Sequence, residues 1–387
     1  MERLYLDNAA TTFPKPPDVA QAVYHYMTSS GVNINRGCYG TAYVVEEQVL
    51  ETRELLCSLF HGPDCGNVIF TKNVTESLNV LLKGFLRPGD HVITSSMEHN
   101  AVMRPLVQLE KTGVSVTRVS CDNQGRLDVD ALESCLRPNT RLVVMTHASN
   151  VCGTILPVAQ VGQFCQKHNL KFFVDSAQTA GVLELDMENM HIDALAFTGH
   201  KGLLGPQGIG GFVLTDELSR ELTPLLSGGT GSLSHTEEVP DFLPDRFEPG
   251  TPNLPGILGL RQGLLFLQKN GIQTVREHEQ TLTRRFREGL RPLKAEGLLR
   301  VLAGENAVER VGVLSVQTLQ AELSQAAFQL DDRFGIQSRV GLHCAPSAHK
   351  TLGSYPTGSI RFSFGFFNTL EDVDRALSAL TEVCHGA

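Results

Sequence analysis

Two charged residues of this chain stand where short apolar runs end. Lys201 follows the run Ala196-Phe197-Thr198, and Asp175 directly follows Val174. A lysine amine in such a place can form a Schiff base, and a carboxylate can pair with a protonated pyridine nitrogen. These two groups are the minimum that a protein contributes to the chemistry of pyridoxal 5′-phosphate. Either residue alone is common in α/β proteins, but the pair in its context predicts a site for that cofactor.

Short apolar runs and amphipathic stretches alternate between residues 66 and 215, and they must position this pair. This alternation predicts an α/β fold with a mostly parallel sheet that is covered by helices on both faces. The expected strands are Asn67–Thr71, His91–Ser95, Val114–Val119, Arg141–Thr146, Lys171–Val174, Ala194–Phe197 and Gly210–Leu214, and the expected helices are Thr75–Phe85, Ala101–Glu110, Val129–Leu136 and Val158–His168.

The segment Ser227–Pro255 has several glycines, prolines and acids and no period, which predicts a long loop at a domain junction. A smaller α+β domain is expected after it. Its helices are predicted at Ile257–Lys269, Thr274–Leu290, Leu319–Arg333 and Leu370–Val383, and its strands at Arg310–Val316 and Ser359–Phe364. We therefore expect a large domain over residues 16–254 and a small domain formed by residues 1–15 and 255–387.

Composition restricts the class of protein. The chain has 387 residues and a formal net charge of −9, which does not favour binding to nucleic acid. It shows no apolar run long enough for a membrane span and no targeting segment, so we expect a cytoplasmic protein. The nine cysteines are odd in number and irregularly spaced, which predicts neither a disulfide framework nor a metal site. Most of them are expected as small core residues.

Several residues near the expected strand ends could serve a phosphorylated cofactor. Thr75 opens an amphipathic helix, whose free N–H groups favour phosphate, although an ordinary helix cap would look the same. Thr198 and His200 flank Lys201 and could add donors to that phosphate. His99 follows another strand and could stack on a planar ring, whereas Gln178 could reach the ring's 3′-oxygen.

A second set of residues could act on a substrate. Cys344 is the only cysteine that we expect in a turn-like loop, beside His343 and near Arg339. A thiol beside cationic groups ionises more readily and becomes a nucleophile, although a passive exposed thiol would fit the same position. Arg361 is a charge within an apolar strand, where it needs an anion such as a substrate carboxylate.

With these residues the chain resembles the class V aminotransferase group of pyridoxal phosphate enzymes. Within that group it is most similar to the cysteine desulfurases and selenocysteine lyases of the SufS-like branch, group II. The motifs run nearly from end to end: Tyr5-Leu6-Asp7-Asn8-Ala9-Ala10-Thr11-Thr12, Asn35-Arg36-Gly37, Asn73-Val74-Thr75-Glu76-Ser77, Glu98-His99-Asn100, Ser149-Asn150-Val151, Asp175-Ser176-Ala177-Gln178, Gly199-His200-Lys201, Gly250-Thr251-Pro252, His343-Cys344-Ala345 and Phe367-Asn368-Thr369.

The resemblance implies a fold-type-I pyridoxal-phosphate-dependent transferase and a homodimer. It assigns Lys201 to the covalent link and to proton transfer, and Cys344 to attack on the substrate sulfur. The cofactor-binding set that it implies is Thr75, Glu76, His99, Asn150, Asp175, Gln178, Thr198, His200, Lys201 and, across the dimer interface, Thr251. Asn150, Arg339 and Arg361 would bind the amino acid, and His99 would also take part in catalysis.

The implied reaction converts L-cysteine to L-alanine and leaves sulfur as a persulfide on Cys344. A sulfur-acceptor protein, as in iron–sulfur cluster biogenesis, would then receive it. A selenocysteine lyase would use the same residues, and an aminotransferase without desulfurase activity is a further alternative, which the thiol disfavours. Leu342, Tyr39 and Phe367 depart from the usual group II motifs, and the first two would lie near the mouth of the site.

Overall fold

The computed structural model describes residues 3–35, 37–304 and 308–386, so Arg36 of the expected Asn35-Arg36-Gly37 motif lies outside the described residues. A seven-stranded sheet forms the centre of the larger part, in the order β2-β8-β7-β6-β5-β3-β4. Among these strands β8 alone runs in the direction opposite to the other six, so the expected mostly parallel sheet is confirmed. The strands are β2 (Val68–Thr71), β3 (His91–Ser95), β4 (Ser115–Val119), β5 (Thr140–Thr146), β6 (Lys171–Asp175), β7 (Ala194–Thr198) and β8 (Gly210–Leu214).

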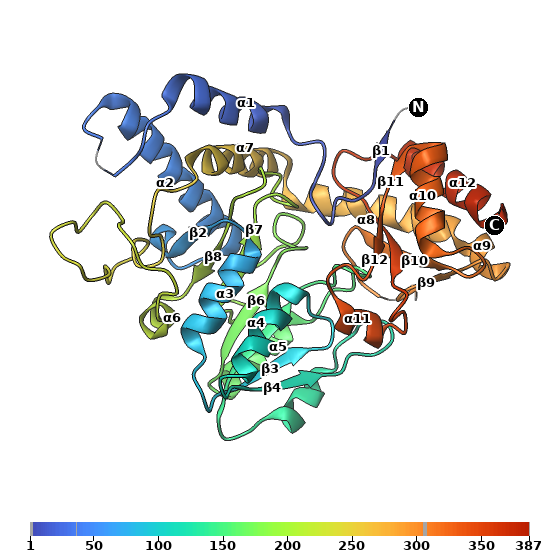
Figure 1. Cartoon of the computed structure of the whole chain (residues 1–387), viewed down its shortest axis with the longest axis horizontal. Helices are drawn as coiled ribbons and strands as arrows, with labels where there is room; N and C mark the ends of the chain where they lie inside the picture. The colour runs from blue at the N-terminus through green and yellow to red at the C-terminus, as the bar shows by residue number, and fades with distance from the viewer. Residues whose placement is uncertain (1–2, 36, 305–307, 387) are drawn as a thin grey trace.

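Helices cover both faces of this sheet, as the unbroken apolar runs of its strands require (Figure 1). On β6, Phe172 and Val174 point into one core, and Phe173 points into the other. The first core is closed by α2, α5 and α7, and the second by α3 and α4. The bounds are α1 (Pro17–His25), α2 (Gly40–Phe60), α3 (Val74–Phe85), α4 (Asn100–Glu110), α5 (Val158–Lys167), α6 (Asp216–Glu221) and α7 (Leu254–Asn270).

The predicted helix at Val129–Leu136 is wrong in type, because Val129–Cys135 forms a 3₁₀ helix, η3. Leu132 is its one fully buried residue. One buried side chain provides little of the packing that stabilises an α-helix in a protein. Two further short helical turns are η1 (Tyr26–Ser30) and η2 (Cys65–Asn67). Helix α2, which no sequence pattern predicted, exposes Tyr43, Val44 and Leu50 outside its buried stripe.

A four-stranded antiparallel sheet, in the order β12-β13-β10-β9, forms the smaller part, on the right of Figure 1. Beside it the N-terminal strand β1 pairs in parallel with β11. Helices α8, α10 and α12 share one apolar core with both sheets. The elements are β1 (Leu4–Tyr5), α8 (Ile272–Gly289), α9 (Arg291–Ala295), β9 (Leu299–Val301), β10 (Val313–Thr318), α10 (Leu323–Phe334), β11 (Ile336–Gln337), β12 (Arg339–Gly341), α11 (Pro346–Thr351), β13 (Ser359–Ser363) and α12 (Leu370–His385).

The division at residues 16–254 stays a prediction, but the cores show how the chain passes between its two parts. The buried residues of α7 belong to the core of the large sheet, and those of α8 from Leu282 onward belong to the core of the small one. Residues 227–245 form an irregular loop at the left of Figure 1, as expected. Within the described ranges no helix combines the length and apolar character that crossing a membrane requires.

The tight approach of α5 to a neighbouring turn gives a test of the fold. A Cβ at Gly162 would lie 1.8 Å from the carbonyl oxygen of Met190, so the backbone must move to accept one. We expect Gly162→Ala to lower the free energy of unfolding by about 2 kcal/mol or more, measured by urea denaturation. The control Gly40→Ala, where a Cβ meets nothing within 4 Å, should stay within about 0.5 kcal/mol of the wild type. Equal effects in both variants would contradict the packing.

Candidate active site

The carboxyl ends of β7, β6, β5 and β3 lie next to one another in the large sheet. Thr198 and Asp175 are the last residues of β7 and β6. Lys201, Asn150 and His99 follow β7, β5 and β3 within four residues. Parallel strands present their carboxyl ends at one edge of a sheet, so these predicted site residues gather at that edge.

Burial controls the charge of Lys201 and Asp175. Asp175 is 2% exposed, and its carboxylate accepts the Ala177 N–H at 2.9 Å. Burial raises the pKa of Asp175, and the Ala177 N–H and the Lys201 charge oppose that rise. Burial lowers the pKa of Lys201 to about 8, against the attraction of Asp175 and with help from Arg361. The amine is therefore far easier to deprotonate than an ordinary lysine, as a nucleophile for a carbonyl must be.

His99 is held as a neutral ring at the start of α4. Its Nδ1 accepts the Ala101 N–H at 3.0 Å, which leaves Nε2 to carry the proton. Burial lowers the pKa of His99 to about 4, and the charges of Lys201, Arg361 and Arg104 act in the same direction. A neutral, oriented imidazole suits stacking on a planar ring.

Glu98 was part of a quoted motif, but sequence reasoning gave it no role. The side chain is fully buried, and its Oε2 accepts the Thr146 N–H at 2.9 Å while the Ser95 hydroxyl donates to Oε1. Glu98 thereby joins the ends of β3 and β5. Burial raises the pKa of Glu98 to about 8.

The residues proposed for a phosphate lie at two places. Beside Lys201, the buried Thr198 Oγ1 and His200 Nδ1 have no hydrogen-bond partner among the described residues. Burial lowers the pKa of His200 to about 4, so this ring is also neutral. At the start of α3, Thr75 is exposed, and the Glu76 carboxylate accepts the Lys72 N–H at 2.6 Å. Glu76 is thus bound to its own loop.

Gln178 and Lys201 line a narrow cavity of about 30 Å³ between the large sheet and α8. The Gln178 amide donates to the Ala9 carbonyl at 3.1 Å. The opposite wall holds Glu279, which is 8% exposed and whose pKa is raised to about 8 by burial. No sequence signal marked Glu279, because it lies on the apolar face of an otherwise polar helix.

Arg361 points inward from β13, as its strand position predicts, and the anion that it meets in the structure is Asp7. Arg361 Nη2 donates to Asp7 Oδ1 at 2.6 Å, and Arg339 Nε donates to Asp7 Oδ2 at 2.9 Å. A third bond runs from Arg361 Nη1 to the Asn150 carbonyl at 3.1 Å. Arg361 Nε is buried without a partner among the described residues, so one donor of this guanidinium is left for a further acceptor.

Cys344 is exposed on the loop between β12 and α11, as expected. The Asn100 N–H donates to the Cys344 carbonyl at 2.8 Å, and the Asn150 amide donates to the His343 carbonyl at 2.7 Å. His343 and Cys344 both adopt positive φ angles, 47° and 56°, a conformation that costs free energy for residues other than glycine. Two hydrogen bonds from residues at the site edge therefore hold the loop of residues 342–345, which we call the thiol loop, against that edge.

Two expectations about the cysteines need correction. Burial lowers the pKa of His343 to about 2, so this ring is neutral and supplies no positive charge to the thiol. Cys38 is also exposed outside helices and strands, but no histidine is adjacent to it. Of the nine thiols only Cys152, Cys165 and Cys384 are fully buried.

Thr251 is exposed and lies in the wall of a surface cavity of about 210 Å³, together with Lys72 and Glu76 of the same chain. Its expected contact with a partner subunit stays a prediction. Tyr39, at the start of α2, is 49% exposed, and Leu342 is half-buried next to His343.

The ion pair of Asp7 gives a second prediction. The Arg361 side chain is 3% exposed, so Asp7→Asn leaves a buried guanidinium without its counter-charge. We expect the free energy of unfolding to fall by about 3 kcal/mol, measured by denaturant titration. The control Glu382→Gln breaks the exposed pair with Arg333 and should cost less than about 1 kcal/mol. A loss in Asp7→Asn no larger than that of the control would contradict the inference.

Glu279 gives a prediction for pH. Burial raises the pKa of Glu279 in the folded chain from its ordinary value of 4.5 to about 8, so the folded state binds this proton more tightly than the unfolded state. The tighter binding of this proton therefore stabilises the folded state fully below about pH 4.5. The stabilisation decreases as the pH rises from there to about 8. In Glu279→Gln the decrease between pH 5 and pH 8 should be smaller than in the wild type. Glu277→Gln, on the exposed face of α8, should keep the wild-type profile, and identical profiles for all three proteins would disprove the assignment.

Comparison with known proteins identifies the family. The model of the family "Aminotransferase class-V" matches residues 4–376. A probable cysteine desulfurase of Methanothermobacter thermautotrophicus is 32% identical, covering 99% of this chain and 95% of the relative. Cysteine desulfurase CsdA of Escherichia coli is 30% identical, covering 97% and 93%. The apo structure of cysteine desulfurase from Thermococcus onnurineus NA1 superposes with a TM-score of 0.92 at 31% identity, covering 100% and 95% of the two chains. The chain therefore belongs to the class V aminotransferase family, among relatives that are named cysteine desulfurases.

Proposed function

We propose that this protein is a pyridoxal-phosphate-dependent cysteine desulfurase that forms L-alanine and carries the sulfur as a persulfide on Cys344. The observation that carries the proposal is the attachment of the thiol loop to the site edge. Two asparagines hold that loop. Asn100 directly follows His99, and Asn150 lies on the same sheet edge as Lys201 and Asp175. An aminotransferase has no need of a thiol held there.

The residues present fit the cofactor. Thr198 Oγ1 and His200 Nδ1 are buried polar atoms without partners among the described residues, which suits a phosphate beside Lys201. Thr75 and Glu76 would help to bind the phosphate chiefly through the free backbone N–H groups at the start of α3. The Glu76 carboxylate already accepts a hydrogen bond from the backbone N–H of Lys72. Asp175 would pair with the ring nitrogen, Gln178 would reach the 3′-oxygen, and His99 would cover the ring face.

When bound through Lys201, the cofactor supplies an electron sink that acidifies the substrate Cα and weakens the Cβ–Sγ bond. Lys201, whose pKa is near 8, can take and return the proton at Cα. Arg361 and Arg339 would hold the substrate carboxylate, with Asn150 beside them. Arg361 Nε has no partner in the described structure, so its N–H can donate to this new anion while Nη2 stays bonded to Asp7.

Cys344 then acts as the sulfur nucleophile. Its thiolate attacks Sγ of the substrate, the new S–S bond forms as the Cβ–Sγ bond breaks, and the amino acid leaves as alanine after protonation at Cβ. The persulfide is passed to a sulfur-acceptor protein. We include a homodimer in the proposal, with Thr251 reaching the partner's cofactor. Selenocysteine would fit the same residues.

Substitution of Cys344 tests the function. We expect Cys344→Ser to lower alanine formation from L-cysteine by at least about a hundredfold, because a serine hydroxyl is not ionised at neutral pH. Mass spectrometry of the wild type after turnover should show added sulfur on the peptide that contains Cys344.

Cys38→Ser is the matched control, since Cys38 is the other exposed thiol, and it should retain the wild-type rate. Formation of a keto acid in place of alanine would instead show an aminotransferase. Much faster turnover of selenocysteine than of cysteine would show a selenocysteine lyase.

A further inference from the structure

A second cavity, of about 400 Å³, opens next to the Cys344 loop, between α4, β4 and the start of α11. Met103, Val107 and Pro346 form its apolar part. Its other lining residues are polar or positively charged: Asn100, Arg104, Gln108, Arg118, Ser347 and Lys350. The cavity plays no part in the mechanism above.

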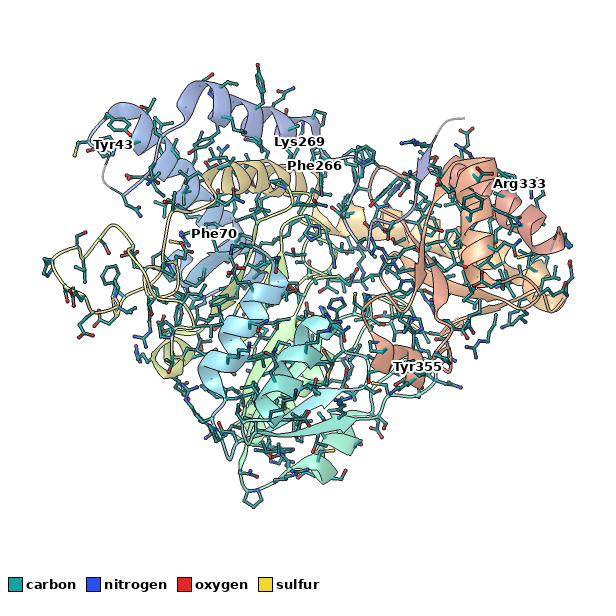
Figure 2. The ribbon with its side chains drawn as sticks, in the orientation of Figure 1. Tyr43, Phe70, Phe266, Lys269, Arg333 and Tyr355 are labelled. Carbon is teal, nitrogen blue, oxygen red and sulfur yellow. The ribbon has the colours of Figure 1, made fainter. Side chains whose placement is uncertain are left out.

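The charge of this cavity is opposite to that of the whole chain. Arg104, Arg118 and Lys350 are all exposed, and the side chain of none of them forms a hydrogen bond or an ion pair with another described residue. The Lys350 Nζ lies over the ring of Tyr355, labelled in Figure 2, at 5.0 Å from the ring centroid. Among the described residues no aspartate or glutamate lines the cavity, although the chain carries a net charge of −9. Three unpaired cations around an apolar floor favour an anionic ligand.

The cavity is tied to the thiol by the chain itself. Asn100 lines the cavity and donates its backbone N–H to the Cys344 carbonyl. Pro346 and Ser347, on the other wall, follow Cys344 by two and three residues. A ligand in this cavity therefore lies beside the loop that carries Cys344, and Lys201 is not among the residues that line the cavity.

We propose that this cavity docks the protein that accepts the sulfur, through an acidic segment of that protein which carries the accepting thiol. The inference rests on the proposed function and adds the chemistry of the partner. Carboxylates of the segment pair with Arg104, Arg118 and Lys350, and an apolar side chain packs on Met103 and Val107.

The transfer itself needs no further reagent. The thiolate of the acceptor attacks the outer sulfur of the Cys344 persulfide, and a new S–S bond forms. The bond between the outer sulfur and Cys344 Sγ breaks at the same time, and its electron pair returns to Sγ as thiolate. The sulfane sulfur moves from one thiol to another without net oxidation or reduction.

Binding of model peptides tests the docking step without turnover. Two fluorescein-labelled eight-residue peptides, each with one central serine in place of the thiol, carry flanking aspartates or flanking lysines. Fluorescence anisotropy should show that the aspartate peptide binds the wild type, and that its affinity falls in 0.5 M salt. The double variant Arg118→Glu with Lys350→Glu should weaken this binding at least about tenfold.

The matched control reverses two exposed cations elsewhere, Arg291→Glu with Lys294→Glu on α9, at the far right of Figure 1. It should bind the aspartate peptide like the wild type. Equal binding of both peptides, or equal binding by both double variants, would overturn the proposal. Tighter binding of a single-stranded RNA oligonucleotide that is lost in Arg118→Glu with Lys350→Glu would also overturn it, in favour of a nucleic-acid acceptor.

Transfer kinetics separate this inference from the proposed function. The same aspartate and lysine peptides with a central cysteine are offered to protein already incubated with L-cysteine, and each rate is divided by the fraction of Cys344 that carries added sulfur. The wild type should favour the aspartate peptide about tenfold, and the cavity variant should lose that preference. Absence of added sulfur on Cys344 would refute the desulfurase, whereas added sulfur with no preference between peptides would refute the docking site alone.

Discussion

The carboxylate of Asp7 lies between two guanidinium groups, and the geometry of the candidate site depends on this arrangement. It binds Arg361 at 2.6 Å and Arg339 at 2.9 Å, so it joins the N-terminal segment to β13 and β12. Arg361 extends the connection to the Asn150 carbonyl, which follows β5 of the large sheet. One carboxylate thus links both sheets at the place where a substrate carboxylate is expected. Because Arg361 is almost completely buried, its position is fixed before any ligand arrives.

Burial, more than the pairing of charges, determines the protonation states around that link. It keeps His99, His200 and His343 neutral and brings the pKa of Lys201 to about 8. Near neutral pH the arginines remain positive because they do not readily lose their protons, and Lys201, with a pKa of about 8, is still largely protonated. The site can therefore bind anions through fixed charges while its neutral imidazoles and easily deprotonated lysine remain available for proton transfer.

Much of the large sheet and of its site edge could be predicted from the sequence, because each central strand is a short apolar run that ends in a polar residue. Asp175 and Lys201 are visible in this way. Asp7 is not, because its partners Arg361 and Arg339 lie 354 and 332 positions away and share no periodic pattern with it. Helix α2 was not predicted, because the exposed apolar residues Tyr43, Val44 and Leu50 obscure its buried apolar stripe in the sequence. The neutrality of His343 depends on its burial in three dimensions, which the sequence alone does not reveal.

The parallel pairing of β1 with β11 has a consequence for synthesis on the ribosome. Leu4 lies opposite Ile336, and Asp7 meets Arg361, so residues 4–7 have no such partners until residues 336–361 have been synthesised. A nascent chain that has passed β8 already contains Lys201 and Asp175 and all seven strands of the large sheet. The thiol loop and the carboxylate-binding arginine arrive only with residues 339–361. The order of translation thus delays the complete candidate site until Arg361 has been made, so a chain interrupted before that residue lacks one of its members.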